Sequence, residues 1–225
     1  MNIGIIGFGY WGTNLVRNFK NIKNCNVTHI AESEVSRHKQ IHELYPDITI
    51  STFDEIIKNS DVDAVVIATH ISSHYELAKA ALENDKHVLV EKPMTSSEKN
   101  AQELIKLSKL KNKILMVDHT YLYSGAVQEI KKSLDANLLG EILYVDSIRA
   151  NLGKFQSDVN VLWDLAPHDI SIINYLINEK PVSVQAFGKS YTKNQLENIA
   201  YLILHYESNK IVHVNCSWIS PIKIR

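Results

Sequence analysis

The sequence predicts an α/β protein in which a doubly wound parallel sheet is followed by an α+β domain with an open, mostly antiparallel sheet. Two observations support this fold class. In the first half, short apolar runs alternate with segments of helical spacing, and the runs are continuously apolar, as strands buried on both faces are. After about Thr120 this alternation stops and strand-like runs follow one another. We therefore expect two domains, residues 1–120 and 121–225.

The first domain is expected to contain six strands joined by five helices. The strand-like runs cover residues 2–7, 26–31, 47–50, 63–69, 87–91 and 113–118. The helical segments lie near residues 11–20, 34–44, 53–59, 73–84 and 97–110. Three segments match the S/T-x-x-E capping box that marks helix starts: Thr52 with Glu55, Ser73 with Glu76, and Thr95 with Glu98.

The second domain is expected to contain two helices and four strands. Residues 124–140 predict one amphipathic helix that ends at Gly140. A second helix starts in "WDLAPHD" (163–169), and because proline is tolerated only in the first turn, it is expected to begin at about Asp164. Ser208 and Asn209 predict the turn between the last two strands. The strand-like runs lie within 141–153 and near 182–190, 197–207 and 210–218.

The end of the chain, "SWISPIKIR", follows the fourth of these strands closely. A four-stranded open sheet that stops there looks short of its natural finish. We therefore expect either a truncated chain or an unusually small second domain.

The composition excludes several classes of protein. Lys and Arg number 24 against 25 Asp and Glu, so nothing favours nucleic acid or an anionic membrane as partner. No apolar run reaches the roughly 18 residues that a membrane span needs, and the start "MNIGIIGFGYWG" predicts no signal peptide. The two cysteines, Cys25 and Cys216, match no metal-ligand spacing, so a reducing, cytoplasmic setting is expected.

A glycine-rich turn follows the first predicted strand. "GFGYWG" places Gly7, Gly9 and Gly12 in the G-x-G-x-x-G spacing between a strand and a helix, which predicts a dinucleotide site with the pyrophosphate at the helix N-terminus. Glu32, at the end of the second strand, would bind the ribose hydroxyls and favour NAD(H) over NADP(H), although the nearby Arg37 weakens this preference. The alternative is an ordinary strand–turn–helix with incidental glycines.

A lysine follows the fifth predicted strand. In "VLVEKPM", Glu91, Lys92 and Pro93 emerge at the carboxyl edge of the sheet, where open parallel sheets bind ligands. A lysine at this place can hydrogen-bond a substrate oxygen, and Pro93 stiffens the turn that carries it. Taken alone, Lys92 could equally be a solvated lysine at a strand end.

Three motifs in this order, "GFGYWG", "EKPM" and "WDLAPHDIS", resemble those of the Gfo/Idh/MocA oxidoreductases, the glucose–fructose oxidoreductase and inositol dehydrogenase family. The resemblance runs along the whole chain and implies a Rossmann domain, an NAD(P)-dependent dehydrogenase or reductase of sugars, cyclitols or nucleotide sugars, and oligomers formed through the second domain's sheet. It places the family's catalytic lysine at Lys92, with a cis Lys92–Pro93 bond, and its D-x-x-x-H pair at Asp164 and His168. His70 departs from the proline that the family often has there, and most members continue well beyond this chain.

"WDLAPHD" would supply the proton chemistry. Asp164 and His168 are spaced i, i+4 and share a helix face. A position at the helix N-terminus would favour a neutral imidazole. We hypothesise that His168 takes the hydroxyl proton, Lys92 polarises the same oxygen and Asp164 orients His168, with Lys92 and His168 converging on one carbinol. The alternative is that Asp164 is an N-cap and His168 a buried structural histidine, and Asp169 is assigned to structure as a first-turn charge.

The remaining candidate residues follow from sheet-edge positions and from the resemblance. His70 and His74 are also spaced i, i+4, but no third ligand is evident, so no metal is expected. Arg149 would hold a phosphate or carboxylate of a substrate. The expected cofactor contacts are Gly7, Phe8, Gly9, Tyr10, Trp11, Gly12, Glu32, Ser33, Arg37, Ala68, Thr69, His70, His74, Glu91 and Lys92. The expected substrate contacts are His119, Tyr121, Arg149, Asn160, Asp164 and His168.

The predicted function is hydride transfer between NAD and a secondary hydroxyl or ketone of a sugar or nucleotide sugar, in a homo-oligomer. One rival is a non-catalytic sensor of the same fold that binds the dinucleotide and regulates through protein contacts. A third possibility is a fragment that binds NAD but has lost activity.

Overall fold

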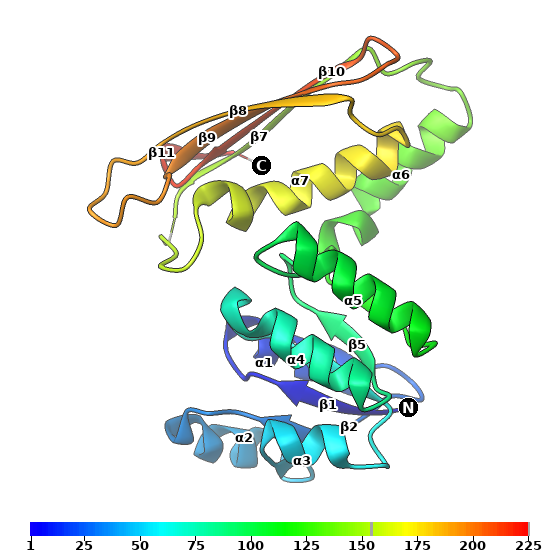
Figure 1. The fold of residues 1–225 in the computed structure, drawn as a ribbon, viewed down its shortest axis with the longest axis vertical. Helices are drawn as coiled ribbons and strands as arrows, with labels where there is room; N and C mark the ends of the chain where they lie inside the picture. The colour runs from blue at the N-terminus through cyan, green and yellow to red at the C-terminus, as the bar shows by residue number, and fades with distance from the viewer. Residues whose placement is uncertain (154, 225) are drawn as a thin grey trace. The chain divides into compact units, whose positions relative to one another are not determined.

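A computed structural model describes residues 1–153 and 155–224 of the chain (Figure 1). The chain divides into two compact units, one from Met1 to Asp118 and one from His119 onward. None of the helices in the described ranges is both long and apolar enough to cross a membrane.

The first unit contains a sheet of six parallel strands in the order β3-β2-β1-β4-β5-β6. This is the doubly wound order in which the chain reverses direction across the sheet between β1 and β4. The strands are β1 (Asn2–Ile6), β2 (Asn26–Ala31), β3 (Thr49–Ile50), β4 (Ala64–Ile67), β5 (His87–Val90) and β6 (Leu115–Val117). The six predicted strands are therefore present, most of them one to three residues shorter than expected.

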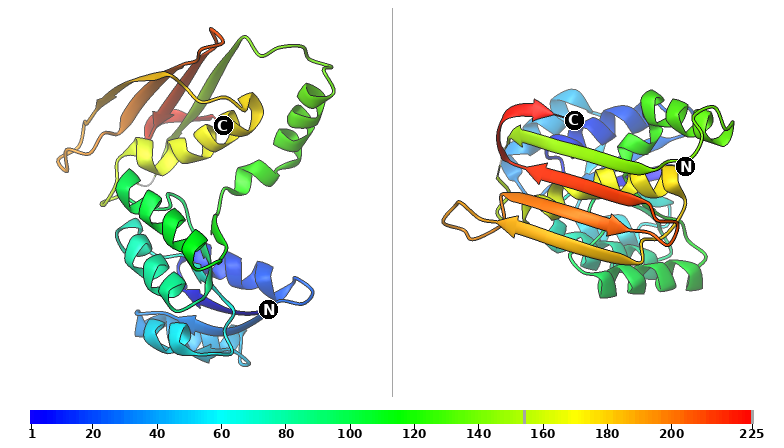
Figure 2. Two further views of the ribbon diagram at one scale, coloured as in Figure 1. Left: turned by 45° about the vertical axis from the view of Figure 1, so that its right-hand side comes forward. Right: turned by 90° about the horizontal axis from the view of Figure 1, so that it is seen from above.

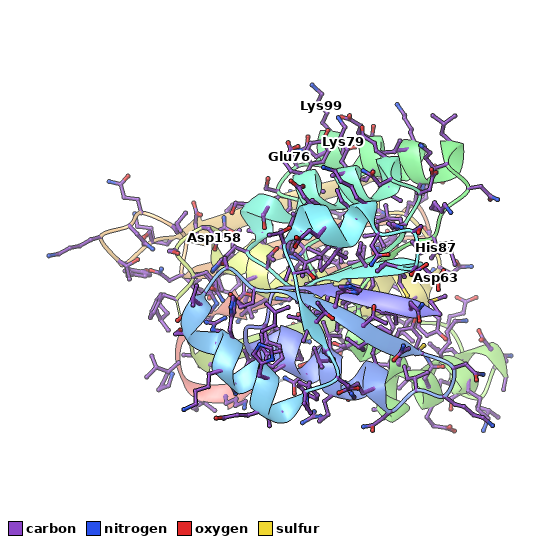
Figure 3. All side chains as sticks on the ribbon, turned by 90° about the horizontal axis from the view of Figure 1, so that it is seen from below. Asp63, Glu76, Lys79, His87, Lys99 and Asp158 are labelled. Carbon is purple, nitrogen blue, oxygen red and sulfur yellow. The ribbon has the colours of Figure 1, made fainter. Side chains whose placement is uncertain are left out.

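Helices cover both faces of this sheet (Figure 1). On one face, α3 (Phe53–Lys58), α4 (Ile71–Glu83) and α5 (Glu98–Leu110) pack on residues such as Val65 and Ile67. On the other, α1 (Tyr10–Lys20) and α2 (His38–Leu44) pack on Ile3, Ile5 and Val66, and the short 3-10 turn η1 (Val35–Arg37) precedes α2. The outward faces of α4 and α5 carry charged side chains, among them Glu76, Lys79 and Lys99 (Figure 3). Successive residues along each strand thus point to opposite faces of the sheet, and both faces are apolar because both are buried.

One of the three predicted capping boxes is confirmed. The Thr52 hydroxyl accepts the Glu55 N–H, and the Glu55 carboxylate accepts the Thr52 N–H. The other two predictions are wrong. Helix α4 begins two residues before Ser73, with His70 at the N-cap position, and the Ser73 hydroxyl donates back to the His70 carbonyl. Ser97, not Thr95, caps α5.

The second unit contains a five-stranded sheet in the order β11-β7-β10-β9-β8, in which only β7 and β10 run parallel (Figure 2, right). Its strands are β7 (Tyr144–Leu152), β8 (Ser183–Lys189), β9 (Ile199–His205), β10 (Ile211–Ser217) and β11 (Ile219–Ile224). Asn209 has a φ of 63° in the predicted Ser208–Asn209 turn. The sequence predicted four strands and missed β11, because Pro221 lies in "ISPIKI", and proline inside a run argues against a strand except at a sheet edge.

Both helices of the second unit differ from the prediction. Helix α6 (Gly125–Asp135) ends five residues before Gly140, because Asn137 adopts the left-handed conformation (φ 54°) and the Leu138 N–H bonds back to the Ser133 carbonyl. Helix α7 (Val161–Ile177) begins three residues before Asp164, and Asn160 rather than Asp164 caps it. Pro167 is therefore the seventh residue of α7 and not part of its first turn.

One face of this sheet packs against α7 through an apolar cluster that includes Leu202, Leu204, Val212 and Val214. The opposite face, onto which the right-hand view of Figure 2 looks, carries the alternate residues of the same strands. Several of them are large, apolar and solvent-exposed: Tyr144, Ile148, Phe187, Tyr201 and Ile211.

Candidate functional site

The glycine turn joins β1 to α1. Gly7 has a φ of 95°, and a Cβ there would lie 2.6 Å from the Ala68 carbonyl oxygen at the end of β4. A Cβ at Gly12 would lie 2.0 Å from the Gly7 carbonyl oxygen, so only glycine lets the helix approach the strand this closely. At Gly9 the nearest atom to an added Cβ is Arg37 Nη1, 3.7 Å away. The backbone at Gly9 therefore faces open space at the start of α1, where a phosphate group can approach helix N–H groups.

The Glu32 side chain holds this turn in place from the end of β2. Its Oε2 accepts the Phe8 N–H at 2.7 Å, and its Oε1 accepts the Glu34 N–H at 2.8 Å. Arg37 Nη1 lies 3.3 Å from Oε2. Burial by itself would raise the pKa of Glu32, but the N–H groups of Glu34 and Phe8 and the Arg37 charge outweigh it and lower the pKa. Glu32 is thus an anion at neutral pH.

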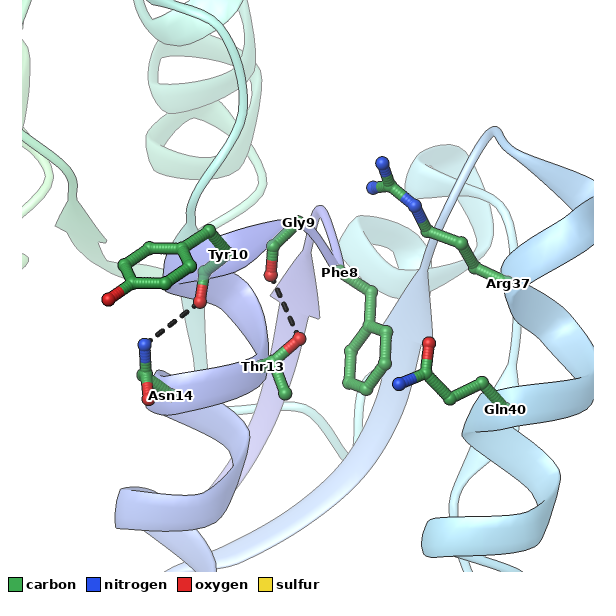
Figure 4. Close-up of a pocket in the computed structure, with 7 residues that line it drawn as sticks. All are labelled: Phe8, Gly9, Tyr10, Thr13, Asn14, Arg37 and Gln40. Carbon is green, nitrogen blue, oxygen red and sulfur yellow. Dashed lines mark hydrogen bonds between the residues drawn. The ribbon is translucent and has the colours of Figure 1, made fainter. Parts of the chain in front are cut away.

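An open hollow of about 360 Å³ lies beside the turn (Figure 4). Its lining combines backbone of the turn with polar side chains of α1, η1 and α2: Phe8, Gly9, Tyr10, Thr13, Asn14, Arg37 and Gln40. Tyr10 is 80% exposed, and its ring meets that of Trp11 edge to face at 5.3 Å. Ser33 is exposed directly after the β2–Glu32 segment. The hollow, the tight glycine cradle and the carboxylate at the end of β2 fit the adenosine diphosphate half of a dinucleotide.

Lys92 follows β5 at the carboxyl edge of the same sheet. The Lys92–Pro93 bond is cis, which confirms the prediction. The neighbouring Glu91 is 8% exposed, and its carboxylate accepts the Lys92 N–H at 3.2 Å. Burial, together with the negative charge of Asp118 at the end of β6, raises the pKa of Glu91 to about 7. The turn that carries Lys92 therefore also contains a carboxyl group, that of Glu91, with a pKa near neutral pH.

His74 supports the Lys92 turn from α4. Its side chain is 1% exposed, with Nδ1 2.9 Å from the Pro93 carbonyl oxygen and Nε2 3.1 Å from the Thr69 carbonyl oxygen. The ring is thus directed at the backbone that follows two strands, β4 and β5. His70, by contrast, is exposed at the start of α4, where the Thr69 and Ser73 hydroxyls hydrogen-bond each other. Asp63 and His87 mark the opposite edge of the sheet (Figure 3).

Asp164 and His168 lie one turn apart on α7. The Asp164 carboxylate accepts the indole N–H of the buried Trp218 at 3.2 Å, which ties α7 to the segment between β10 and β11. Because α7 begins at Val161, His168 is its eighth residue. The expected effect of the helix N-terminus on His168 is therefore wrong, since such effects fall off within the first turn. Asn160 uses its amide oxygen to cap α7 and its amide nitrogen to bond Glu197, so it serves the helix start.

The second unit also brings together residues that the sequence placed separately. Arg149 of β7 forms a bidentate ion pair with Asp169 of α7, at 2.8 and 2.9 Å. Arg149 also lies over the ring of Tyr121, which belongs to the 3-10 turn η2 (Thr120–Tyr123) just after His119. The prediction that Asp169 is a first-turn charge is wrong, because it is the ninth residue of α7 and pairs with Arg149. The Arg149 guanidinium, predicted to hold a substrate anion, uses Nε and Nη2 to pair with Asp169 inside the unit.

Three contacts of the candidate site residues were missed from the sequence: Asp118 beside Glu91, Asp169 with Arg149, and Trp218 with Asp164. Asp118 had a usable signal, since it ends the sixth predicted strand at the ligand edge. The other two join residues that are 20 and 54 positions apart, and no spacing indicates them. In residues 1–153 and 155–224, no group of three or more His, Cys, Asp or Glu side chains could hold a metal ion.

The chain is similar in sequence to curated dehydrogenases. The chain is 24% identical over 200 residues to an inositol 2-dehydrogenase/D-chiro-inositol 3-dehydrogenase of Lactiplantibacillus plantarum, covering 85% of this chain and 57% of that protein. It is 27% identical over 190 residues to a UDP-N-acetylglucosamine 3-dehydrogenase of Acidithiobacillus ferrooxidans, covering 84% of this chain and 58% of that protein. The chain spans about half the length of the curated relatives it matches.

The fold is shared with solved structures. An oxidoreductase of Agrobacterium radiobacter, crystallised with NAD+, L-tartaric acid and magnesium, superposes with a TM-score of 0.89 at 18% identity, over 100% of this chain and 68% of that one. Residues 1–119 match the model of the oxidoreductase family with an NAD-binding Rossmann fold. Residues 127–224 match the model of the GFO/IDH/MocA C-terminal domain. The glycine turn, the Glu-Lys-Pro turn and the Asp-x-x-x-His helix occur together in this chain. The chain belongs to the Gfo/Idh/MocA oxidoreductase family.

Proposed function

We propose that the protein is an NAD-dependent dehydrogenase or reductase acting on a secondary hydroxyl or ketone of a sugar, cyclitol or nucleotide sugar. The observation that carries this proposal is the position of Lys92. It follows β5, at the edge where the glycine turn also emerges from the neighbouring half of the sheet. Ligands of open parallel sheets bind at this edge, next to the point where the strand order reverses.

NAD, when bound, accepts or supplies the hydride. The chain's own residues do the rest. The Gly9 backbone and the start of α1 hold the phosphates, and Glu32 binds the hydroxyls of the adenosine ribose. We assign Lys92 to the reacting oxygen as a hydrogen-bond donor, His168 to the hydroxyl proton as acid or base, and Asp164 to the orientation of His168.

The names of the relatives support the substrate class. One acts on inositols and another on UDP-N-acetylglucosamine, and both substrates are polyhydroxylated rings. A ring with several similar hydroxyls requires a site that selects one of them.

The test is NADH formation with a panel of cyclitols, sugars and nucleotide sugars, by the wild-type chain and by Lys92→Ala and His168→Ala. We expect each variant to lose about 100-fold or more in kcat, with NAD affinity retained. Lys109→Ala on α5 and His42→Ala on α2 are matched controls, because both side chains are exposed in the last turns of their helices, away from the carboxyl ends of the strands. Unchanged turnover in both Lys92→Ala and His168→Ala would remove these roles. NAD binding without turnover of any substrate by the wild-type chain would favour a regulator.

The open face of the second sheet supports a homo-oligomer. Phe187 is 61% exposed and Tyr144 is 69% exposed on this face, and a second copy would cover both. Light scattering on the wild type and on Phe187→Asp tests this part, and a monomeric wild type would exclude it. We also propose that the protein is cytoplasmic, as the two separated cysteines predict.

A further inference from the structure

A buried ion pair is the first in a series of side-chain contacts that leads to His168. Arg149 Nε donates to Asp169 Oδ2 at 2.8 Å, and Arg149 Nη2 donates to Asp169 Oδ1 at 2.9 Å. The two side chains are only 8% and 7% exposed. A bidentate pair fixes the plane of the guanidinium as well as its position. Burial by itself would lower the pKa of Arg149, but the hydrogen bonds to Asp169 and its charge raise it, so the cation is maintained.

The guanidinium in turn holds an aromatic ring. The central carbon of the Arg149 guanidinium lies 4.6 Å from the centre of the Tyr121 ring, within the range of a cation–π contact. Tyr121 belongs to η2, which precedes α6 and is distant in sequence from both β7 and α7. Arg149 therefore connects three elements of the second unit: β7, α7 and η2.

The ring of Tyr121 then contacts the imidazole. The centres of the Tyr121 and His168 rings are 4.7 Å apart, with an angle of 72° between the rings. His168 and Asp169 are consecutive in α7. The contacts therefore form a closed loop, from Asp169 to Arg149, from Arg149 to Tyr121 and from Tyr121 to His168. Rotation of the imidazole would push against a ring that is itself held by a buried ion pair.

We propose that Tyr121, Arg149 and Asp169 are positioning residues that fix the plane of the His168 ring. This inference rests on the proposed function for its catalytic meaning, since it is the acid–base role of His168 that gives a fixed ring plane its value. It assigns Tyr121 and Arg149 to the support of His168, whereas the sequence suggested direct substrate contacts. Asp164, one turn before His168, would orient the same ring from the helix.

The test is NMR of the full chain with 15N-labelled histidine side chains, without substrate. The chain has ten histidines, and the His168 ring signals are assigned by their loss in His168→Gln. Tyr121→Leu removes the neighbouring ring and is expected to shift these signals and broaden them, whereas Tyr121→Phe keeps the ring and should leave them near their wild-type positions. Tyr123→Leu removes an exposed ring from the same turn and is the matched control.

A second variant covers the case in which Tyr121→Leu fails to fold. Arg149→Met with Asp169→Leu replaces both charges by apolar side chains of similar volume, a change that folded proteins often tolerate. It should broaden the His168 signals while the other histidine signals stay in place. On an identified substrate, Tyr121→Leu should lower kcat about 10- to 100-fold through misplacement of the imidazole, with the NAD dissociation constant unchanged and activity restored in Tyr121→Phe.

The outcomes separate this inference from the proposed function. His168 signals that are identical in wild type, Tyr121→Leu and the double variant would overturn the positioning role, whatever the activity. His168 signals that change as expected, in a chain that turns over no sugar, would retain the positioning role and overturn the proposed function.

Discussion

The two units build their sites by different means. In the first unit, the backbone determines the positions: the glycine turn, the cis Lys92–Pro93 bond and the Pro93 and Thr69 carbonyls that face His74. In the second unit, side chains determine them: the Arg149–Asp169 pair, the Tyr121 and His168 rings and the Trp218 indole on Asp164. A site set by backbone leaves a local sequence motif, because glycine and proline are required at fixed places. Side-chain partners that lie far apart in the chain, such as Arg149 with Asp169, leave no such motif.

The largest expected effect is at a glycine of the first unit. In Gly12→Ala the added Cβ would lie 2.0 Å from the Gly7 carbonyl oxygen, so β1 and α1 must separate. We expect a loss of at least about 4 kcal/mol of unfolding free energy and no measurable NAD binding. Urea denaturation and fluorescence titration with NADH measure both.

The matched control lies in the second unit. An added Cβ at Gly125, the first residue of α6, meets nothing within 4 Å. We expect Gly125→Ala to be neutral or stabilising by up to about 1 kcal/mol. Equal effects at Gly12 and Gly125 would contradict the claim that backbone approach determines the first site.

The next largest effect on stability is expected at the buried ion pair of the second unit. Arg149→Met leaves the Asp169 carboxylate buried without its cation, and we expect a loss of about 3 kcal/mol. The double variant Arg149→Met/Asp169→Leu should recover most of it. In the first unit, Lys79→Met breaks the exposed ion pair with Glu103 and should not measurably change the melting temperature. A double variant no more stable than Arg149→Met would show that the loss comes from removal of the ion pair and not from the unpaired Asp169 carboxylate.

The pH dependence of the first unit gives a smaller effect. The pKa of Glu91 is raised from an ordinary value of 4.5 to about 7, so the folded protein binds this proton more tightly than the unfolded chain does. The resulting stabilisation is fully present below about pH 4.5 and is lost as the pH rises through about 7. We expect a loss of about 1–3 kcal/mol between pH 4.5 and pH 8, measured by urea denaturation. Glu91→Gln should reduce this slope, and an identical slope in the variant would assign the pH dependence elsewhere.

The smallest effect concerns a helix cap. Thr52→Ala removes the confirmed capping box of α3 and should cost about 1 kcal/mol. Thr52→Ser retains the hydroxyl and should stay within a few tenths of the wild type. A loss in Thr52→Ser as large as that in Thr52→Ala would mean that the threonine methyl group, and not the cap, stabilises this helix start.

The same contrast explains what could be predicted from the sequence. The six strands of the first unit, its glycine turn and the Lys92 turn were predicted because continuous apolar runs, glycine and proline are local signals. The start of α7 was placed three residues too late, because Pro167 was expected only in a first turn, and the helix tolerates it as its seventh residue. The pairing of Arg149 with Asp169 had no local signal, since the chain must fold before β7 and α7 meet. The strand β11 was missed for a related reason, because an edge position tolerates the proline that argues against a central strand.

The double use of Glu32 limits how this protein could be redesigned. The carboxylate expected to discriminate between the two nicotinamide dinucleotides also accepts a hydrogen bond from the Phe8 N–H, which belongs to the glycine turn. Exchanging it for a small residue to admit a 2′-phosphate would therefore loosen the cradle for the diphosphate as well. An engineered change of coenzyme needs a replacement acceptor for that N–H, such as the amide oxygen of glutamine, before any new cation is introduced beside Arg37.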